Sequence, residues 1–473
     1  MEGLIENKWL AAVFALLSIL LLTVNGFAQT TGDYASDEVI FELTNPTNLP
    51  AVAAQYKLVP TPLEQVGAPP TYRMRINRDP KAGTTQTPEQ IVAQMRSDAR
   101  ITKPEVNRRL STAEREGLPW TLGRSWSIGR SWSIGGSSKG YARQWFPKTI
   151  RLEEAYTAAG TRGLTVEANP RPVRVAVLDT GIDLTHPAFA GRLAPGYDFV
   201  DNDDNPSEEG ALRQGAFGHG THVAGIIALV APDAKIMPIR VLDSNGEGEL
   251  WKVARAIIWA LDPDGNPNTN DGADVINISF GYPEKVRLIK DLADFCDDGA
   301  TPDLKTFPEV GGARVPFIIG AGNGGDAAPI YPAAERADSV SGILAVAASN
   351  RFDKLADFST INDGGVSGGR RWVRAVAPGE NIVSALPGGR YGVWSGTSMA
   401  APVAAGIAAL IRAKNPNPQA FSAIQIVDRI DDSGFEWDCF HAGRGIEIKT
   451  SRLDALCAVT GQACGAPPVN PCQ

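Results

Sequence analysis

Histidine and cysteine are scarce in this sequence, and basic residues are not in excess. Only four histidines and five cysteines occur among 473 residues, and the formal net charge is −8. No basic stripe indicates a nucleic-acid partner, and the acidic balance favours solubility. The few histidines leave few candidates for a general base. One pair, His219 and His222, has H-x-x-H spacing, but neither a nearby cysteine nor an H-E-x-x-H glutamate completes a zinc site.

The N-terminal apolar run is shorter than the about 20 residues that a membrane helix needs. It covers Trp9 to Val24 and is followed by G-F-A, which fits a signal-peptide cleavage after Ala28. We therefore predict a signal peptide over residues 1–28 and a secreted protein, extracellular or periplasmic. The usual positive charge before the run is missing, because Glu2 and Glu6 offset Lys8. An uncleaved membrane anchor stays open as the alternative.

Three short strings place an aspartate, a histidine and a serine in settings suited to acyl-transfer chemistry. Asp179, in VAVLDTGID, ends an apolar run that predicts a buried parallel strand. His219, in GHGTHVAG, lies between two glycines at the start of a predicted helix. Ser398, in GTSMAAP, opens an apolar helix, so its hydroxyl and backbone N–H lie where the helix dipole favours negative charge.

Each of these residues alone has an ordinary structural explanation. Asp179 would suit a turn after a strand, and Ser398 would suit a helix cap. Together they follow one another in the order Asp, His, Ser. This order differs from that of the same three residues in chymotrypsin-like enzymes and in α/β-hydrolases. From about Tyr141 to Val459 the sequence resembles the subtilisin-like serine proteases. The resemblance implies an α/β fold with a doubly wound parallel sheet flanked by helices.

The resemblance also implies the catalytic roles. Ser398 would be the nucleophile, His219 the general base and then acid, and Asp179 the residue that orients the imidazole. Asn323, at the end of VPFIIGAGN, would donate its amide to the oxyanion together with the backbone N–H of Ser398. His222 matches the second, non-catalytic histidine of the family.

Substrate binding is expected along two strands that pair with an extended peptide. The family pattern implies broad specificity with a preference for apolar side chains. One wall of the primary pocket would come from NISFG and the other from A-G before Asn323, and GEGELW would form the second flanking strand. The predicted substrate-binding residues are Ser279, Phe280, Gly281, Ala321, Gly322 and Gly248.

The chain is too long for one ordinary core, so two folded units with tails are expected. Between residues 37 and 106 the pattern predicts strands over 38–44, 58–66, 72–76 and 100–106, with helices over 48–57 and 87–99. This βαββαβ order is ferredoxin-like. It resembles the propeptide of subtilisin-like proteases, an inhibitor and intramolecular chaperone; a separate substrate-binding domain is the alternative.

The predicted organisation therefore has five parts. A repeated GRSWSI string followed by GGSSKG predicts a flexible, protease-accessible linker. The parts are a signal peptide (1–28), a propeptide (29–110), the linker (111–140), a catalytic domain (141–459) and a cysteine-containing tail (460–473).

Four of the five cysteines cluster near the C-terminus, which in a secreted protein predicts two disulfides whose pairing stays open. A Cys457–Cys464 bond would close a small loop, and Cys296 stands apart in a predicted acidic loop. No cysteine lies in a catalytic string, so a cysteine nucleophile is disfavoured.

Calcium is the one metal that the resemblance suggests, as a structural ion; no cofactor is expected for the chemistry. A family site that needs an acidic residue after H-P is not expected, because Ala188 stands there. Two oxygen-rich loops remain as candidates, with solvated acidic turns as the alternative. The candidate ligands are Asp198, Asp201 and Asp203 in the first loop, and Asp262, Asp264 and Asn266 in the second.

The sequence thus predicts a secreted, monomeric serine endopeptidase that acts on peptides and proteins and has no nucleic-acid partner or stable membrane association. A catalytically silent relative that binds peptides is the first alternative, and a passive structural surface protein is the second. A sedolisin-type carboxyl peptidase is excluded, because that class lacks the histidine string GHGTHVAG.

Overall fold

The computed structural model describes residues 34–112, 121–122, 133–211, 215–266, 268–298, 314–338, 342–362, 372–441, 443 and 446–465. The predicted signal peptide, most of the GRSWSI repeat and Cys472 lie outside these residues. Within the described ranges, no helix combines the length and the apolar character needed to cross a membrane.

The largest sheet in the described part of the chain has nine strands and carries the predicted aspartate at the end of one of them. Its strands run parallel, apart from an antiparallel hairpin at one edge. Their order across the sheet is β18 (Phe435–His441), β19 (Ile446–Arg452), β15 (Val373–Pro378), β14 (Ile343–Ser349), β13 (Phe317–Gly320), β11 (Val275–Ile278), β7 (Arg174–Asp179), β9 (Lys235–Arg240) and β8 (Tyr197–Asp198).

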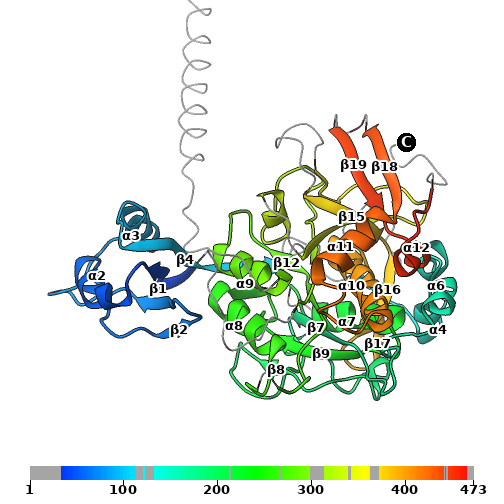
Figure 1. Ribbon diagram of the computed structural model, residues 1–473, viewed down its shortest axis with the longest axis horizontal. Coiled ribbons are helices and arrows are strands. Elements are labelled where there is room, and N and C mark those ends of the chain that lie inside the picture. Colours follow the sequence, from blue (N-terminus) through cyan, green and yellow to red (C-terminus); the bar gives the residue numbers. More distant parts are fainter. Residues whose placement is uncertain are drawn as a thin grey trace, which may run out of the picture.

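Helices cover both faces of this sheet, as a doubly wound fold requires (Figure 1). Alternate residues of β7 show the two faces: Val175 and Val177 join one apolar cluster, whereas Ala176 and Leu178 join the other. The helices of the described residues are α2 (Leu49–Gln55), α3 (Pro88–Met95), α4 (Ser138–Ala142), α5 (Phe146–Thr149), α6 (Leu152–Ala159), α7 (His219–Val230), α8 (Leu250–Leu261), α9 (Arg287–Asp298), α10 (Thr397–Lys414), α11 (Ala423–Asp432) and α12 (Ala455–Thr460), with 3-10 turns η1 (Pro46–Asn48), η2 (Pro187–Phe189) and η3 (Ala333–Asp338).

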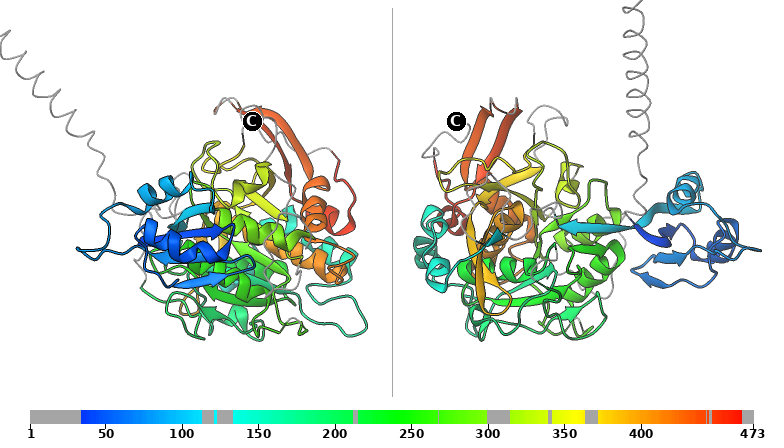
Figure 2. Two further views of the ribbon diagram at one scale, coloured as in Figure 1. Left: turned by 60° about the vertical axis from the view of Figure 1, so that its left-hand side comes forward. Right: turned by 180° about the vertical axis from the view of Figure 1, so that it is seen from behind.

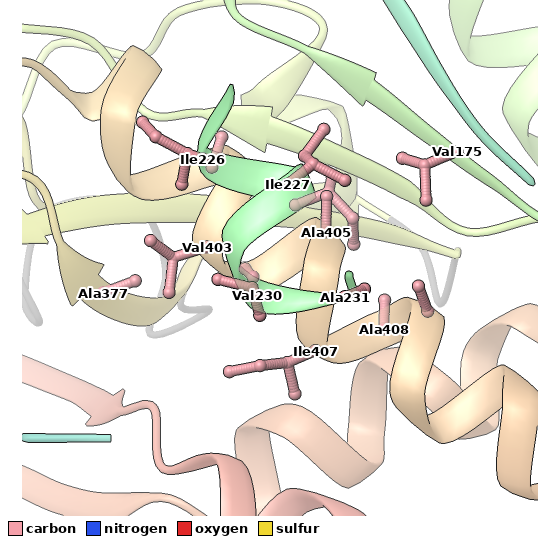
Figure 3. Packing of buried hydrophobic residues seen from close by; sticks show 14 of the residues in the cluster. Val175, Ile226, Ile227, Val230, Ala231, Ala377, Val403, Ala405, Ile407 and Ala408 are labelled. Carbon is pink, nitrogen blue, oxygen red and sulfur yellow. The ribbon is translucent and has the colours of Figure 1, made fainter. Parts of the chain in front are cut away.

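Helices α7 and α10 pack against each other inside the first cluster, and each begins at or next to a predicted catalytic residue (Figure 3). Ile226 and Val230 of α7 are completely buried, as is Val403 of α10. The approach is close at Gly406, where an added Cβ would lie 2.6 Å from the Val230 side chain. A glycine is therefore needed at this crossing.

A smaller N-terminal unit stands beside α8 and α9 (Figures 1 and 2). It contains strands β1 (Tyr34–Leu43), β2 (Glu64–Val66), β3 (Thr71–Arg75) and β4 (Ile101–Thr112) together with α2 and α3, in the order strand–helix–strand–strand–helix–strand. Its antiparallel sheet has the order β4–β1–β3–β2 and covers its own apolar cluster, which includes Phe41 and Met74. Helix α3 begins with a capping box between Thr87 and Gln90.

Strand β4 extends further than the sequence pattern predicted, past residue 106 to Thr112. It leaves the N-terminal unit and pairs with β10 (Glu247–Glu249) and β12 (Phe280–Gly281) of the larger unit. Part of the predicted linker is also regular. Strands β5 (Thr121–Leu122) and β6 (Ser133–Ile134) pair in parallel, and β6 joins the hairpin of β16 (Ile382–Leu386) and β17 (Arg390–Trp394).

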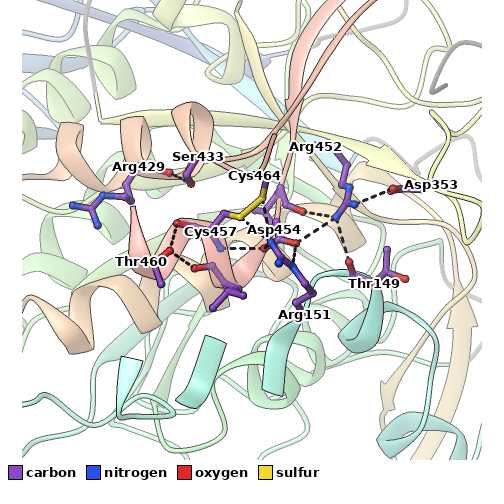
Figure 4. The surroundings of a disulfide bond; sticks show 12 residues. Thr149, Arg151, Asp353, Arg429, Ser433, Arg452, Asp454, Cys457, Thr460 and Cys464 are labelled. Atoms are coloured by element: carbon purple, nitrogen blue, oxygen red, sulfur yellow. Dashed lines mark hydrogen bonds and ion pairs between the residues drawn. A yellow bond between two sulfur atoms is a disulfide. The ribbon is translucent and has the colours of Figure 1, made fainter. Parts of the chain in front are cut away.

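One disulfide, Cys457–Cys464, joins α12 to the segment just after it and closes a small loop, as the sequence suggested (Figure 4). Arg151 contacts this loop and forms a two-pronged ion pair with Asp454 at 2.8 Å, so the start of α6 is held against the C-terminal end. Cys439 is also disulfide-bonded. The prediction for Cys296 is wrong: it lies buried on α9 rather than in a loop, because the segment forms an amphipathic helix whose apolar side faces the second cluster.

Arg240, at the end of β9, holds together the first of the two acidic loops. Its guanidinium contacts the buried carboxylate of Asp198 at 2.6 Å and also contacts Asp201 and Glu209. Asp203 uses its carboxylate for a turn with Asn205 instead. Because the guanidinium of Arg240 already takes the central place among these carboxylates, we do not propose calcium at Asp198, Asp201 and Asp203.

Replacing Arg240 with Met should leave three carboxylates without their shared cation. Since Arg240 and Asp198 are buried, we expect a loss of about 3 kcal/mol of unfolding free energy, and added calcium should restore part of it. The measurement is the thermal midpoint with and without calcium. The matched control is Arg255→Met, which breaks an exposed pair with Glu64 and should change the midpoint little. If calcium raised the wild-type midpoint as much as that of the variant, the assignment would be contradicted.

Candidate active site

Asp179 and His219 form a buried pair at the carboxyl edge of the main sheet. Asp179 ends β7 and His219 begins α7, and the distance from His219 Nδ1 to Asp179 Oδ1 is 2.7 Å. Asp179 Oδ1 also accepts the backbone N–H of Thr180 at 2.8 Å. With Nδ1–H donating to the carboxylate, the basic lone pair of the imidazole lies on Nε2. The structure therefore brings the two predicted residues together.

Ser398 lies in the first turn of α10, one residue after its start. Its hydroxyl donates to the backbone carbonyl of Ser279 at 3.1 Å, and the Ser279 hydroxyl donates to the Ser398 carbonyl at 3.3 Å. The serine is buried, and the positive end of a helix of 18 residues lies at its backbone N–H. This contact ties the start of α10 to the strand segment 277–281.

Asn323 is held beside Ser398 through Thr397. The side-chain oxygen of Asn323 accepts the backbone N–H of Thr397 at 2.8 Å, and the Thr397 hydroxyl accepts the N–H of Gly322 at 2.9 Å. Fixing the amide oxygen in this way also fixes the direction of the amide nitrogen. The predicted oxyanion residues therefore come together although they are 75 positions apart.

His222 lies one turn along α7 from His219, and its contacts indicate a role in packing rather than in catalysis. Its ring stacks on Trp394, with ring centroids 4.5 Å apart and planes 3° apart. Burial, together with the neighbouring His219, lowers the pKa of His222 to about 3, so this ring is neutral at ordinary pH. His186 is also structural: its Nδ1 accepts the N–H of Ala188 and its Nε2 lies 2.9 Å from the carbonyl of Arg390.

Glu208 is a residue of this site that the sequence analysis missed. Helix α7 has no side-chain cap of its own at Gly218, and Glu208 supplies one by accepting the N–H and hydroxyl of Thr221. The backbone of Glu208 also bonds to Ile182, just after Asp179. Glu208 thus connects the strand end that carries the aspartate with the helix that carries the histidine.

The Oε1 atom of the Glu208 carboxyl group is shielded from solvent, although the residue as a whole is half-buried. Burial raises its pKa to about 7, hydrogen bonds from Thr180, Gly218 and Thr221 oppose this, and the nearby carboxylate of Asp179 adds to it. The string P-S-E-E around Glu208 does not predict that this residue caps α7. Its partner, Thr221 in the first turn of α7, lies 13 residues further along the chain.

The predicted substrate strands lie on either side of β4, which occupies the expected place of an extended peptide. In this antiparallel arrangement Leu110 is opposite Gly248, and Thr112 is opposite Phe280. The Thr112 N–H donates to the carbonyl of Gly246 at 3.1 Å. The other predicted wall, Ala321 and Gly322, follows β13 and is buried.

The second acidic loop has oxygen donors that fit a hard cation. Carboxylate oxygens of Asp262, Asp264 and Asp271 lie within 4.8 Å of one another. Burial raises the pKa of Asp262, and the neighbouring Asp264 and Asp271 add to the effect. Asn266 contributes mainly through its backbone N–H, which donates to Asp262 and Asp264. Of the three ligands predicted from the sequence, Asp262 and Asp264 therefore lie together, and Asp271 takes the place of Asn266 as the third candidate ligand.

The sequence of this chain is similar to those of known proteins. The sequence profile of the Subtilase family matches residues 171–432. The chain is 36% identical over 296 residues to a thermophilic serine proteinase of Bacillus sp. (strain AK1), covering 60% of this chain and 61% of that protein. It is 32% identical over 308 residues to thermitase of Thermoactinomyces vulgaris, covering 63% of this chain and 92% of thermitase. Subtilisin E of Bacillus subtilis (strain 168) is 34% identical over 288 residues, covering 58% of this chain and 64% of Subtilisin E.

The matched segment contains all four residues of the predicted catalytic apparatus, and the first and third of these relatives are covered over less than two thirds of their length. With a family profile over more than half of the chain and thermitase covered almost throughout, the chain belongs to the subtilase family.

Proposed function

We propose that this protein is a secreted serine endopeptidase that is made as a self-processed precursor. The observation that carries the proposal is the buried Asp179–His219 pair at the same sheet edge as Ser398, with an extended strand of the chain itself paired between β10 and β12. A catalytically silent peptide-binding protein is the alternative. The filled positions at Asp179, His219 and Ser398 favour the enzyme.

In the proposed mechanism, the proton of the Ser398 hydroxyl passes to His219 Nε2 as Oγ attacks the carbonyl carbon of the substrate. Asp179 keeps the imidazole in the correct tautomer and stabilises its charged form. The resulting oxyanion is held by the backbone N–H of Ser398 and the amide of Asn323. His219 then donates the proton to the leaving amine, and a water molecule activated by the same histidine hydrolyses the acyl-enzyme.

The N-terminal unit would serve as a ferredoxin-like propeptide that covers the site. Two of its side chains cap helices of the catalytic domain: Glu105 accepts the N–H groups of Arg287 and Leu288 at the start of α9, and Asn107 accepts the N–H of Trp251 at the start of α8. Lys103 adds an ion pair with Asp291 at 2.8 Å. These contacts would hold β4 between β10 and β12, and would order the catalytic domain while blocking it.

Secretion and a structural calcium ion at Asp262, Asp264 and Asp271 complete the proposal. The predicted signal sequence supports the first, and three converging carboxylates support the second. The proposed chemistry uses neither a metal nor an organic cofactor. We propose that the enzyme acts as a monomer on peptide and protein substrates, with its own propeptide as inhibitor and chaperone.

The activity itself is tested with a fluorophosphonate probe and a casein digestion assay. The processed wild type should label and digest casein, whereas Ser398→Ala should do neither, because the nucleophile is gone. Asn323→Ala should label slowly and lose about 10²–10³ in kcat, which is the loss that follows removal of the oxyanion-hole asparagine from a subtilisin. A wild type that binds peptides but neither labels nor cleaves would favour the silent alternative.

Processing provides a second test. Thr112 is opposite Phe280, and the Ser398 hydroxyl bonds to Ser279 next to it, so the cut should fall at the first bonds after Thr112. Purified Ser398→Ala should stay at precursor length, and N-terminal sequencing of the mature wild type should begin shortly after Thr112. A mature N-terminus before Arg109 or beyond Tyr141, or normal maturation of pure Ser398→Ala, would contradict self-processing.

Inhibition by the propeptide should depend on pH through Glu105. Burial raises the pKa of Glu105 from 4.5 to about 7 in the docked state, opposed by its bonds to Leu288 and Arg287. Docking then favours the protonated form, so binding is strongest below pH 4.5 and weakens as the pH rises through 7. Between pH 5 and pH 8 the affinity should fall by at least about tenfold.

The measurement is inhibition of the processed enzyme by its own N-terminal unit as a function of pH. Glu105→Gln should flatten the pH dependence, because no titrating group remains at that position. Asn107→Ala is the matched control: it removes a neutral cap from α8 and should weaken inhibition equally at every pH. A Glu105→Gln profile identical to that of the wild type would exclude this role.

A further inference from the structure

Ile330 lies close to the two glycines that the sequence analysis assigns to opposite walls of the primary pocket. The segment that contains Ile330 is held against the end of β12 by two backbone hydrogen bonds between Tyr282 and Tyr331, at 2.8 and 2.7 Å. Ile330 is half-buried, and its carbonyl accepts the N–H of Ala334 at the start of η3. The sequence analysis did not single out this residue, because it lies outside every recognised string.

The two branches of Ile330 touch both of the proposed pocket walls. A Cβ placed on Gly281 would lie 2.4 Å from Ile330 Cγ2, and one placed on Gly322 would lie 2.9 Å from Ile330 Cγ1. Real Cβ atoms do not tolerate such contacts, so both glycines are needed for the isoleucine to fit. The space between the walls therefore holds a branched side chain of this chain itself.

The register of β4 shows which part of a substrate would meet Ile330. Ser111 is opposite Gly281 and Thr112 is opposite Phe280, and Ser279 comes next along the antiparallel partner. The Ser279 carbonyl is also the group that the Ser398 hydroxyl contacts. A substrate bound like β4 would thus present the residue after the Thr112 position to the nucleophile, beside the wall that begins at Ser279.

We propose that Ile330 restricts the residue on the acyl side of the cut bond to small side chains such as Gly, Ala and Ser. The proposal rests on the peptidase activity proposed above and narrows its substrate class, since glycine and apolar walls alone would admit large apolar side chains. The chain's own sequence agrees, because Leu110, Ser111 and Thr112 are followed by an alanine. Pocket volume decides such selection, because a side chain that overlaps Ile330 cannot bring its carbonyl to Ser398.

The test uses peptides patterned on β4, Leu-Ser-Thr-X-p-nitroanilide, with X as Ala, Leu or Phe. The wild type should have a kcat/KM for Ala at least about tenfold above that for Phe. Ile330→Gly should raise the value for Phe by at least about tenfold and leave the value for Ala within about threefold, which inverts or abolishes the preference. Ile330→Ala should lie between the two.

The ratio of two substrates in one preparation does not depend on the active fraction, so partial misfolding of Ile330→Gly does not obscure the result. Val166→Gly is the matched control, because Val166 is an exposed branched residue outside the cleft strands, and its ratio should equal that of the wild type. A wild type that prefers Phe or Leu over Ala, or an Ile330→Gly ratio within about twofold of the wild type, would overturn the role of Ile330. A wild type that cleaves none of the peptides and does not react with the fluorophosphonate probe would instead overturn the peptidase proposal.

Discussion

The contact between α7 and α10 is the constraint on which the site depends. Both helices lie in one apolar layer over the main sheet, and both begin at its carboxyl edge. Gly406 lets α10 approach Val230 of α7 more closely than any other residue would. A rigid layer of this kind transmits small displacements, so a shift of either helix would move His219 relative to Ser398.

Buried polar groups at the site are held by partners that come from different elements. Asp179 bonds to His219, Glu208 bonds to Thr221, and the Asn323 amide bonds to Thr397. In a low-dielectric interior such bonds are strong, and the loss of one partner is costly. The network therefore fixes orientation as well as stability, which electrostatic stabilisation of a developing oxyanion requires.

In the proposed function, the backbone of a peptide and its side chains are recognised by different parts of the site. Strands β10 and β12 contact β4 through main-chain pairing, which any extended peptide can supply. The same pairing explains how a segment of the chain can lie along the cleft while Glu105 and Asn107 anchor its unit to α9 and α8. In the proposal made above, selection among side chains is left to the space beside Gly281 and Gly322, where Ile330 lies.

Local sequence determined the parts whose shape depends on neighbouring residues. The apolar strand before Asp179, the glycines around His219 and the small-residue helix after Ser398 are readable because strand, turn and helix follow from short patterns. The βαββαβ order of the N-terminal unit and the small Cys457–Cys464 loop were readable for the same reason. The family pattern then linked these parts into one site.

Only the tertiary structure decided which distant groups meet. Arg240 fills an acidic loop that begins 42 residues earlier, and Glu105 caps a helix whose second residue lies 183 positions away. The extension of β4 to Thr112 depends on pairing with β10 and β12, and Cys296 is buried because α9 packs on the second cluster. Such contacts are set by how the layers pack, which short-range patterns do not encode. The short motifs and their resemblance to a known family therefore predicted the catalytic residues, whereas packing decided what surrounds them.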